Sequence, residues 1–556
     1  MGQMDVGKNG PCCIMKKREK KQTKRAYFDT EDNSETISDV SQRRVTQVCA
    51  VDDSDCWHCS DNVEALLTWF EENKITHAYA HNLQYDLGNL FGDCLDDLDL
   101  LTAGSRIIRA KYKGITFLDT SNMFGPVKLA SIGKIFGLEK LERDLSGWDY
   151  VKRDVEIVRK GVQYWNRFVE SYGVEKIPAT LSGAAVKVWQ AMGGDNWYCD
   201  DDLAHKALYG GRVEVFDTAG EAGIYSYYDF NSLYPWSMTG DFATESRRLR
   251  DITEHCVADV TITVPESWCP PLPYRGKDGL YFPFGTWRGV YVGLELLNAI
   301  ENGCTVQKIH SCHGSKQGRK YYAEFIEHFY SKRVDATSES DKLMFKIFMN
   351  GLYGQLGMSG SLKRTRPLAE YDFDKEGDYI GTGIPFGAKV LDDMELELPS
   401  HVNYIHAATV TARARVKLHK LMISLKGKLC YCDTDSVFVR LQKEEHPVEV
   451  GKGLGCLKHE GFANHAEFIA PKLYTFGDKA AAKGVPQQLA FEFIEKGFAE
   501  FKKPTKLMTA LKAFDLSSGP RLSVWETKTR TRRKGYSKKT QTRKGYKPLC
   551  VNQIKK

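Results

Sequence analysis

A short acidic turn inside an apolar hairpin constrains this chain more than any other feature. The segment YCDTDS at 431–436 interrupts apolar and β-branched residues, and it predicts a strand–turn–strand hairpin over 429–439. Residues two apart on an extended chain share a face, so Asp433 and Asp435 can point at one spot. Crowded carboxylates cost free energy unless a cation lies between them, and a divalent metal ion would fit. An acidic surface turn explains the same residues, because Asp, Thr and Ser all favour turns.

A further carboxylate lies at a predicted strand end far upstream. Asp229 follows the strand-like run IYSYY at 224–228 and precedes a polar turn in DFNSLYP at 229–235. The segment 342–354 has helical periodicity instead. Its polar residues are spaced four, four and three apart, so they share one helix face: Lys342, Lys346, Asn350 and Tyr353. Such a stripe suits a polyphosphate with a ring attached, although taken alone it is more typical of a solvated helix face.

Taken in order, these segments resemble the motifs of the family B DNA polymerases. DFNSLYP resembles the first palm motif, and YCDTDS resembles the second palm motif. The segment from Lys346 to Gly354 resembles the fingers motif. Lys472-Leu473-Tyr474 resembles the Lys-x-Tyr element that follows, and AKGVP at 482–486 resembles a later palm element. Each string alone would be moderate support. Five strings in the family's order make a chance match very improbable.

The front of the chain resembles a second set of motifs. Asp29 and Glu31 form an Asp-x-Glu pair in YFDTE, HNLQYD at 81–86 gives Asn-x-x-x-Asp, and Tyr150 precedes Asp154 by one helical turn. This trio is similar to the three motifs of the DnaQ-like 3′–5′ proofreading exonucleases that are fused to family B polymerases. The alternative for Asp29 and Glu31 alone is a charged loop, since more polar residues follow.

The length of the chain points to one branch of the family. With 556 residues the chain resembles the compact, protein-primed polymerases of small bacteriophages and linear plasmids, which carry two extra palm insertions. The 117 positions from Asp229 to Lys346 leave room for the first, and FPFGTWRGVYVGLE at 282–295 is similar to a stretch of plasmid-type members. The stretch 357–400 can hold the second. Two ordinary loops are the alternative, but structureless loops of that length are unusual in compact domains.

The sequence also departs from the family pattern. The branch shows Tyr-x-Gly-Gly between its two domains, whereas the aromatic residue is displaced by one here, in Tyr209-Gly210-Gly211. Gly351 replaces a common serine in the fingers motif, and the segment Asp119-Thr120-Ser121 lacks an expected leucine. These departures weaken the support for the DNA contacts that are expected of Tyr209, Gly210, Gly211 and Thr120. They do not concern the catalytic carboxylates.

The resemblance implies an α/β and α+β multidomain fold, with an RNase H-like exonuclease domain followed by a right-hand polymerase with palm insertions. The expected boundaries are a basic tail over 1–25, the exonuclease domain over 26–195, the polymerase domain over 205–525 and a basic C-terminal tail over 526–556. Within the polymerase domain they are the palm over 205–250 and 400–480, the first insertion over 250–325, the fingers over 326–358, the second insertion over 359–400 and the thumb over 485–525.

The resemblance also assigns roles at a polymerase site. Asp229 and Asp435 would be shared ligands of two Mg²⁺ ions, with Mn²⁺ as a substitute, and the carbonyl of Phe230 would complete the nucleotide-side ion. Asp433 would support the site and bind metal less directly, and Lys346 would hold the triphosphate.

Further roles concern the nucleotide and the primer. Lys332 or Arg333 would supply the second triphosphate cation, and the spacing does not decide which. Tyr234 would stack under the sugar and exclude a 2′-hydroxyl. The remaining expected contacts are Asn350 and Tyr353 with the nascent base pair, and Lys472 and Tyr474 with the primer end.

At an exonuclease site the resemblance implies water as the nucleophile. The expected ligands of two metal ions are Asp29, Glu31, Asp86 and Asp154. Tyr150 would orient the water, and Asn82 and Thr120 would contact the frayed single strand.

The charge of the chain is unevenly distributed. The net charge is +6, yet residues 526–556 hold twelve Lys and Arg residues against one acid, with Tyr536 and Tyr546 among them. Such a run suits phosphate contacts plus base stacking, so we expect DNA contact there. The basic run at 16–25 fits a solvated disordered tail equally well. Either run also resembles a nuclear import signal.

Cysteine usage and hydropathy indicate the cellular compartment in which the protein works. The chain has 15 cysteines, but no signal peptide or 20-residue apolar span, so we expect reduced thiols, an intracellular location in a host cell and no membrane partner. Cys56 and Cys59 form a lone C-x-x-C, without a second pair at zinc-finger spacing. Whether they bind zinc does not follow from the sequence.

Three functions stay open on the sequence. The first is a protein-primed replicative DNA polymerase with proofreading, whose partners would be primer-template DNA, deoxynucleotides, single-stranded DNA and a terminal protein. The second is a family B polymerase that starts from nucleic-acid primers or from none. The third is a DNA-binding scaffold with inactive sites, against which the presence of all seven carboxylates argues. The host element and the identity of a priming protein do not follow from the sequence.

Overall fold

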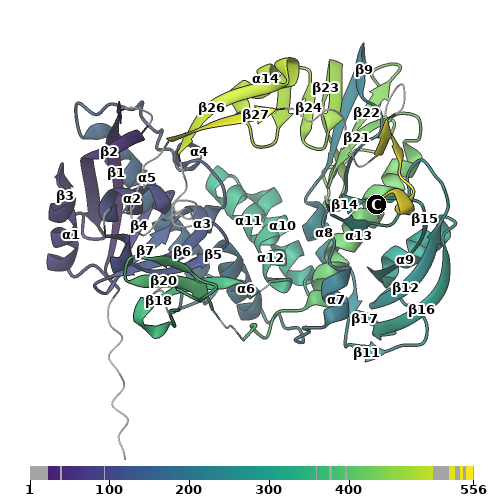
Figure 1. The fold of residues 1–556 in the computed structure, drawn as a ribbon, viewed down its shortest axis with the longest axis horizontal. Helices are drawn as coiled ribbons and strands as arrows, with labels where there is room; N and C mark the ends of the chain where they lie inside the picture. The colour runs from purple at the N-terminus through teal and green to yellow at the C-terminus, as the bar shows by residue number, and fades with distance from the viewer. Residues whose placement is uncertain are drawn as a thin grey trace, which may run out of the picture.

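The computed structural model describes residues 23–554 apart from 38–39, 93, 278, 359, 375–378, 395–396, 505–524, 532–538 and 542–545. A ten-stranded sheet forms the N-terminal part of the fold, on the left of Figure 1. Its strands are β1 (Arg25–Ile37), β2 (Val40–Asp52), β3 (Trp57–Ser60), β4 (His77–Ala80), β5 (Asp99–Ala103), β6 (Arg106–Tyr112), β7 (Ile115–Asp119), β18 (Leu362–Pro367), β19 (Ile384–Phe386) and β20 (Lys389–Asp393). They are ordered β19-β20-β18-β5-β6-β7-β4-β1-β2-β3, with β1, β4 and β7 parallel.

Alternation along β1 decides which helices cover each face of this sheet. Ala26 and Phe28 pack in the core formed with α1 and α2, whereas Tyr27 packs in the core that contains α5. Because side chains alternate along a strand, Asp29 and Glu31 share the face of Tyr27 and point toward α5. The helices of this part are α1 (Val63–Glu72), α2 (Leu83–Phe91), α3 (Ser121–Phe124), α4 (Leu129–Ile135), α5 (Asp149–Glu170), α6 (Leu181–Ala191) and α7 (Asp202–Ala207).

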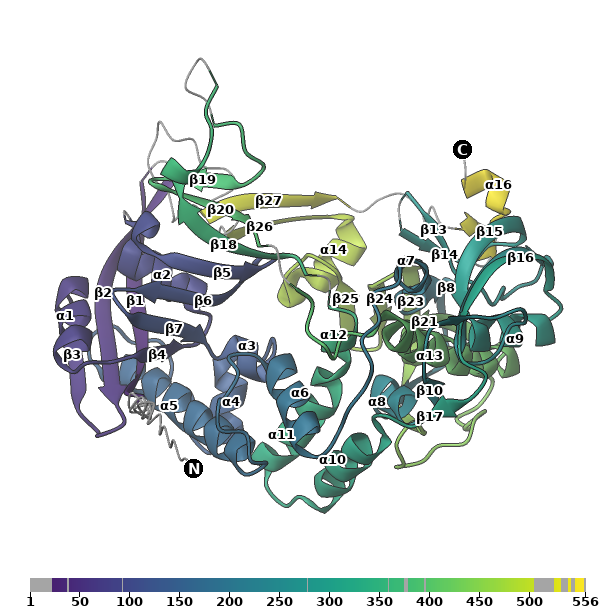
Figure 2. The same ribbon diagram turned by 90° about the horizontal axis from the view of Figure 1, so that it is seen from below.

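The segment 362–393 extends the N-terminal sheet. Its strand β18 pairs antiparallel with β5, so that Leu362 lies opposite Ala103 and Arg364 opposite Leu101. Figure 2 shows β18 alongside β5, although more than two hundred residues separate them in the chain. The stretch expected to hold the second insertion is therefore structured, and it lies against the N-terminal sheet.

A seven-stranded sheet forms the second large unit, on the right of Figure 1. Its strands are β8 (Val213–Val215), β9 (Ala219–Phe230), β21 (Leu429–Asp433), β22 (Ser436–Leu441), β23 (Leu457–Ala470), β24 (Leu473–Phe476) and β25 (Lys479–Ala482). They are ordered β25-β24-β23-β9-β22-β21-β8. Two helices cover this central sheet, α8 (Leu233–Met238) and α13 (Tyr404–Ser424). The strongly apolar hairpin of β21 and β22 lies inside it, with Cys430, Cys432, Val437 and Val439 buried.

Helices lie between the two large sheets. They are α10 (Ala323–Asp335), α11 (Glu339–Gly351) and α12 (Tyr353–Leu356), and α11 packs against both α10 and α6. Phe348 of α11 contacts Trp165 and Phe168 of α5, with ring centroids 5.4 and 4.8 Å apart. One core thus joins these helices to the N-terminal unit. None of the helices in the described part of the chain is both long and apolar enough to cross a membrane.

The stretch 250–325, where the first insertion was expected, also has regular structure. A four-stranded sheet, β11-β16-β12-β15, packs on α9, and two small strand pairs flank it. The elements are β10 (Phe242–Ala243), β11 (Arg247–Arg248), β12 (Cys256–Val264), β13 (Tyr274–Gly276), β14 (Gly279–Tyr281), β15 (Gly285–Val292), α9 (Gly293–Glu301), β16 (Thr305–Gly314) and β17 (Gly318–Arg319).

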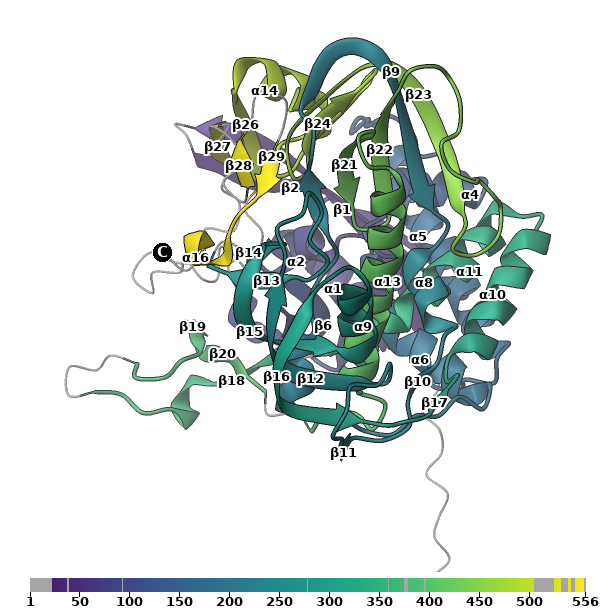
Figure 3. The same cartoon turned by 90° about the vertical axis from the view of Figure 1, so that its right-hand side faces the viewer.

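The C-terminal segment returns to the central sheet. Its elements are α14 (Ala490–Lys496), β26 (Phe498–Pro504), β27 (Trp525–Thr531), β28 (Lys539–Gln541), β29 (Tyr546–Pro548) and α16 (Val551–Ile554). Figure 3 shows α16 beside β14 and β15. Tyr546 is buried in the core with Tyr431 and Phe438, so the expectation that it stacks on DNA is wrong. Tyr536 lies outside the described residues.

One expectation about the cysteines is also corrected. Cys49 of β2 and Cys59 of β3 lie directly opposite each other, and they form a disulfide. The antiparallel register brings their side chains together, which the sequence spacing does not show. Cys56 is an exposed free thiol, so Cys56 and Cys59 do not form a paired zinc ligand set in this structure.

A buried ion pair ties the central helix α13 to α9. The guanidinium of Arg415 donates to Glu295 at 2.7 and 2.9 Å, and both side chains are almost completely enclosed. The same guanidinium donates to the carbonyls of Tyr209 and Gly210 at 2.8 and 3.0 Å. Arg415 therefore fixes the chain just before β8 as well as the packing of α13 against α9.

We expect Arg415→Ala to destabilise the protein by about 3–5 kcal/mol, because it leaves the Glu295 carboxylate buried without its partner. The measurement is the free energy of urea unfolding. Lys420→Ala is the matched control, since Lys420 lies on the same helix and faces Glu301 of the same partner helix at 3.7 Å, but in an exposed pair. That control should cost less than about 1 kcal/mol. Equal losses for the two variants would contradict the prediction.

Candidate active sites

The turn between β21 and β22 brings Asp435 beside Asp229. Ser436 lies opposite Asp229 in the register of β22 and β9, and the Phe230 amide donates to the Asp435 carbonyl at 2.8 Å. Thr434 adopts a left-handed backbone conformation, with a φ of 61°, that side chains rarely adopt. Two segments about 200 residues apart in the sequence therefore place their acids at adjacent strand ends.

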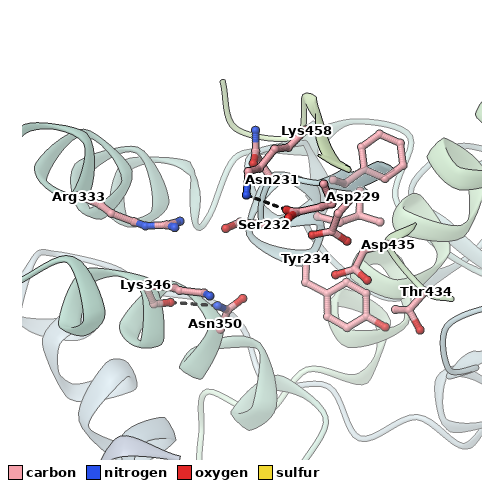
Figure 4. A pocket seen from close by; sticks show the side chains of 13 residues that line it. Asp229, Asn231, Ser232, Tyr234, Arg333, Lys346, Asn350, Thr434, Asp435 and Lys458 are labelled. Carbon is pink, nitrogen blue, oxygen red and sulfur yellow. Dashed lines mark hydrogen bonds and ion pairs between the residues drawn. The ribbon is translucent and has the colours of Figure 1, made fainter. Parts of the chain in front are cut away.

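A pocket of about 430 Å³ opens at these acids. Figure 4 shows Asp229 and Asp435 on one side of it, with Arg333 of α10 and Lys346 of α11 across from them. The pocket is lined by Asp229, Phe230, Asn231, Ser232, Leu233, Tyr234, Arg333, Lys346, Asn350, Thr434, Asp435, Lys458 and Glu460. A site with carboxylates facing cations suits a ligand that carries both metal ions and phosphates.

Asp229 and Asp435 have raised pKa values. Burial, and then the charge of Asp435, raise the pKa of Asp229 to about 7, and Glu460 adds to the shift. Burial also raises the pKa of Asp435. Like charges enclosed together resist ionisation, and a bound cation would relieve that cost. The electrostatics therefore favour a cation between the two carboxylates.

Asp433 is engaged differently from the other two acids. The ammonium of Lys472 lies 2.8 and 2.9 Å from its two carboxylate oxygens. The Lys472 amide donates to the Tyr431 hydroxyl at 2.9 Å, and Lys472 has a φ of 59°. Asp433 does not line the pocket, so it lies outside the Asp229–Asp435 pair and anchors the loop between β23 and β24.

Only some of the residues expected to bind nucleotide line the pocket. Arg333 lines the pocket, whereas Lys332 is exposed on α10 and does not line it. Tyr353 does not line the pocket but packs edge-on against Tyr234, with ring centroids 5.1 Å apart. Lys342 forms an ion pair with Glu339 at 2.8 Å outside the pocket. Of the stripe Lys342, Lys346, Asn350 and Tyr353, the pocket thus includes Lys346 and Asn350.

Sequence reasoning missed two charged residues of this pocket. Lys458 lies opposite Asp229 in the register of β23 and β9, and its ammonium lies 2.8 Å from the carboxylate of Glu460. Lys458 and Glu460 are two positions apart on a strand, and this spacing was the signal that could have identified them.

A second acidic cluster lies on the N-terminal sheet. Ligand atoms of Asp29, Glu31 and Asp154 all lie within 4.8 Å of one another, and the three residues are buried. Asp29 and Glu31 come from β1, and Asp154 comes from α5, which covers that face. The alternation of β1 and the turn of α5 together bring the expected residues to one point.

Asp86 of α2 lies on the other side of β1. Its carboxylate accepts hydrogen bonds from the Thr30 amide and hydroxyl at 3.1 and 2.9 Å, and its second oxygen is buried without a hydrogen bond. One oxygen of Asp154 is also buried without a hydrogen bond. Burial, and then the charge of Asp86, raise the pKa of Asp29 well above its ordinary value. Buried carboxylate oxygens without partners are suitable metal ligands.

Two cations at this cluster were missed by sequence reasoning. The Lys140 ammonium contacts the Asp154 carboxylate, and the Arg143 guanidinium lies 3.0 Å from Glu31. Tyr150 lies beneath Lys140, whose ammonium is 4.5 Å from the ring centroid. Burial raises the pKa of Tyr150 to about 12, and the charges of Glu31 and Asp29 add to it. The basic spacing in LEKLER at 138–143 was the available signal.

The residues expected to contact DNA differ in their exposure. Thr120 is 2% exposed and its hydroxyl contacts His81 at 2.9 Å, so the expectation of strand contact is not met there. Asn82 is exposed at the start of α2. Tyr209 is buried against Tyr291 beneath two arginines, so its expected DNA contact is wrong in this structure. Tyr474 is half-buried beside Tyr431.

The close approach of residue 211 to the Thr434 side chain explains why this residue is a glycine. A β-carbon at this position would lie 2.6 Å from the Thr434 side chain, so any other residue would displace the acidic turn. Gly210 is exposed, and its carbonyl accepts from Arg415. The glycine pair therefore permits the close approach of the chain to the turn between β21 and β22.

We expect Asp229→Asn to stabilise the metal-free protein at pH 8 by a few degrees in unfolding temperature. Because the pKa of Asp229 is raised to about 7, ionising it costs folding free energy that grows from the pKa of the unfolded chain, about 4, up to pH 7. The gain should therefore shrink as the pH falls and vanish near pH 4. Thermal unfolding with a chelator present measures it, with the exposed Asp478→Asn as control. A variant no more stable than wild type at pH 8 would contradict the prediction.

Comparisons with known proteins agree with this geometry. The family described as DNA polymerase type B, organellar and viral, matches residues 79–384. A protein named probable DNA polymerase from Podospora anserina is 24% identical over 465 residues, which cover 65% of this chain and 38% of that protein. Another from Ascobolus immersus is 29% identical over 295 residues, which cover 49% of this chain and 24% of that protein. The chain thus spans well under half the length of either relative.

The fold is similar to that of Phi29 DNA polymerase. In its orthorhombic crystal form the TM-score is 0.72 at 16% identity, over 92% of this chain and 100% of that chain. For Phi29 DNA polymerase complexed with primer-template DNA and incoming nucleotides the TM-score is 0.70 at 15% identity, over 92% of this chain and 99% of that chain. This likeness confirms the expected fold, a multidomain right-hand polymerase fold that follows an N-terminal α/β domain. Because the family match covers more than half of its residues, this chain belongs to the organellar and viral type B DNA polymerases.

Proposed function

We propose that this protein is a DNA-directed DNA polymerase with a 3′–5′ proofreading exonuclease. The observation that carries the proposal is the pocket in which Asp229 and Asp435 face Arg333 and Lys346. Carboxylates on one wall suit metal ions, and cations on the other suit a triphosphate. A catalytically inactive scaffold would have no need to keep two carboxylates together at the cost of raised pKa values.

The donor set of the pocket fits Mg²⁺. Hard oxygen ligands are what this ion prefers, and the residues that would hold it are Asp229, Asp435 and the carbonyl of Phe230. A pair of divalent ions supplies charge neutralisation on the attacking and leaving oxygens of nucleotidyl transfer. Asp433, paired with Lys472, would fix the turn between β21 and β22 and the loop between β23 and β24. It would do so without direct contact with an ion.

The other residues of the pocket position the nucleotide. Lys346 and Arg333 would bind the triphosphate and offset charge on the departing pyrophosphate. Tyr234 would lie under the sugar and exclude a 2′-hydroxyl, with Tyr353 packed against its edge. Asn350 would contact the nascent base pair, and Lys472 and Tyr474 would hold the primer end.

The N-terminal cluster suits hydrolysis of a 3′-terminal nucleotide. Asp29, Glu31, Asp86 and Asp154 would hold divalent ions, which the buried unpartnered oxygens of the last two support. Tyr150 would orient the attacking water, and Asn82 would contact the frayed strand. Lys140 and Arg143 offset part of the acidic charge while the site is free of metal.

The protein-primed mode of initiation is the finer part of the proposal. Its support is that both stretches expected as palm insertions have regular structure, one beside the central sheet and one extending the N-terminal sheet. The partner would then be a terminal protein that offers a hydroxyl group in place of a primer. Initiation from nucleic-acid primers or without any primer is the alternative.

We expect Asp435→Ala to lower the rate of primer extension by several orders of magnitude. Trimming of the 3′ end should persist, because the two acidic clusters are separate. Asp86→Ala should abolish trimming and leave extension intact. The assay uses purified protein, Mg²⁺, labelled deoxynucleotides and a primed template. Extension that survives Asp435→Ala would overturn the site assignment.

For protein priming, we expect a labelled nucleotide to become covalently attached to a terminal protein in the absence of any nucleic-acid primer. The transfer to a protein hydroxyl uses the same carboxylates, so the adduct should be absent with Asp435→Ala. Denaturing gels of reactions with candidate terminal proteins, with and without a primer, measure it. Efficient synthesis from primers together with no adduct would favour nucleic-acid priming instead.

A further inference from the structure

A lysine from the C-terminal segment is buried inside the central sheet. Lys539 of β28 is 5% exposed, and its ammonium donates to the Val215 carbonyl at 3.1 Å. The same ammonium lies 3.3 Å from the Glu214 carboxylate and 3.6 Å from the ring centroid of Phe216. All three contacts are with β8 or the residue that follows it, so a basic residue expected to reach DNA is directed into the protein.

Burial of this ammonium is costly, and it is compensated by one carboxylate. Burial lowers the pKa of Lys539, and Glu214 opposes that shift. Glu214 also accepts from the Arg212 guanidinium at 2.5 Å, and Arg212 donates to the Pro270 carbonyl at 2.8 Å. Two buried cations therefore share Glu214. Removing one member of such a buried group changes the charge balance of the others, so the positions of the three side chains depend on one another.

The strand that Lys539 holds is the neighbour of the acidic turn. In the register of β8 and β21, Val213 lies opposite Asp433 and Glu214 opposite Cys432. The Arg212 carbonyl accepts from the Thr434 amide at 2.7 Å, and a β-carbon at Gly211 would lie 2.6 Å from the Thr434 side chain. A displacement of β8 would therefore pass directly to the turn that carries Asp433 and Asp435.

Two residues that follow Lys539 in the C-terminal segment are also anchored in the fold. The Tyr546 amide donates to the Phe216 carbonyl at 3.1 Å, and its hydroxyl donates to the Ile469 carbonyl at 3.3 Å. Val551 packs in the core of the four-stranded sheet, and its amide donates to the Phe284 carbonyl at 2.9 Å. The described residues of the segment thus contact β8 through Lys539 and the start of β15 through Val551.

We propose that Lys539 is a positioning residue of the polymerase site, which holds β8 so that the turn between β21 and β22 keeps Asp435 beside Asp229. This inference rests on the proposed polymerase function. Lys539 acts through Glu214 and the β8 backbone, and it contacts neither the pocket nor its ligands.

The test compares Lys539→Met with Lys547→Met in the full-length protein. Methionine keeps most of the volume and removes the charge, and Glu214 keeps Arg212 as its partner, so the fold should persist. Lys547 lies on the adjacent strand β29 and is exposed, so it is a matched control for the basic character of the segment. Hydrogen exchange, read by mass spectrometry, reports on peptides covering 210–217 and 429–441.

For Lys539→Met we expect faster exchange in those two peptides and a fall in kcat for extension of about ten- to a hundredfold, since small misplacements cost that much. The KM for the nucleotide should change little, because Lys346 and Arg333 stay in place. Trimming of single-stranded DNA should match wild type, which shows that the fold is intact. Lys547→Met should leave exchange in those two peptides unchanged, and any fall in its extension reports the contribution of the segment's charge alone.

Two outcomes would overturn the inference. One is unchanged exchange at 429–441 with Lys539→Met. The other is an equal loss of extension and of DNA affinity in both variants, which would mean that the segment contacts DNA through its charge. If the wild-type protein does not extend primers at all, the proposed function fails, and the exchange comparison still decides whether Lys539 holds the turn.

Discussion

The repulsion between two enclosed carboxylates is the constraint on which the rest of the site depends. Asp229 and Asp435 lie at adjacent strand ends, and the pKa of Asp229 is raised to about 7 because its charge is half-buried beside another. A fold keeps such a pair only where surrounding structure holds it. The left-handed turn at Thr434, the close packing of Gly211 and the β8 strand all serve to hold it here.

The two acidic clusters balance their charge in different ways. In the N-terminal cluster, Lys140 and Arg143 contact the acids directly. At the central sheet, Lys472 pairs with Asp433 outside the pocket, and Lys458 lies next to Asp229 in the strand register. Arg333 and Lys346 lie across the pocket from Asp229 and Asp435. The first arrangement offsets the acidic charge inside the protein itself. The second leaves an acidic wall and a basic wall, which suits a ligand that carries both metal ions and phosphates.

Distant segments hold both sites together. Arg415 joins α13 to α9 and to the chain before β8, β18 joins the segment 362–393 to β5, and Lys539 joins the C-terminal segment to β8. Each contact links residues more than a hundred positions apart. The geometry of the two acidic clusters therefore depends on parts of the chain that carry no motif.

The sequence by itself determined the local chemistry, because strand alternation and helical spacing fix which neighbours share a face. Together with the resemblance to known motifs, this singled out the acids at 29, 31, 86, 154, 229 and 435 and the Lys346–Asn350 face of a helix. It could not show that Lys539, Tyr209 and Tyr546 are buried, since nothing local distinguishes a buried lysine or tyrosine from an exposed one. Only the tertiary structure decided between Lys332 and Arg333 and paired Cys49 with Cys59, because register and packing between distant segments set those contacts.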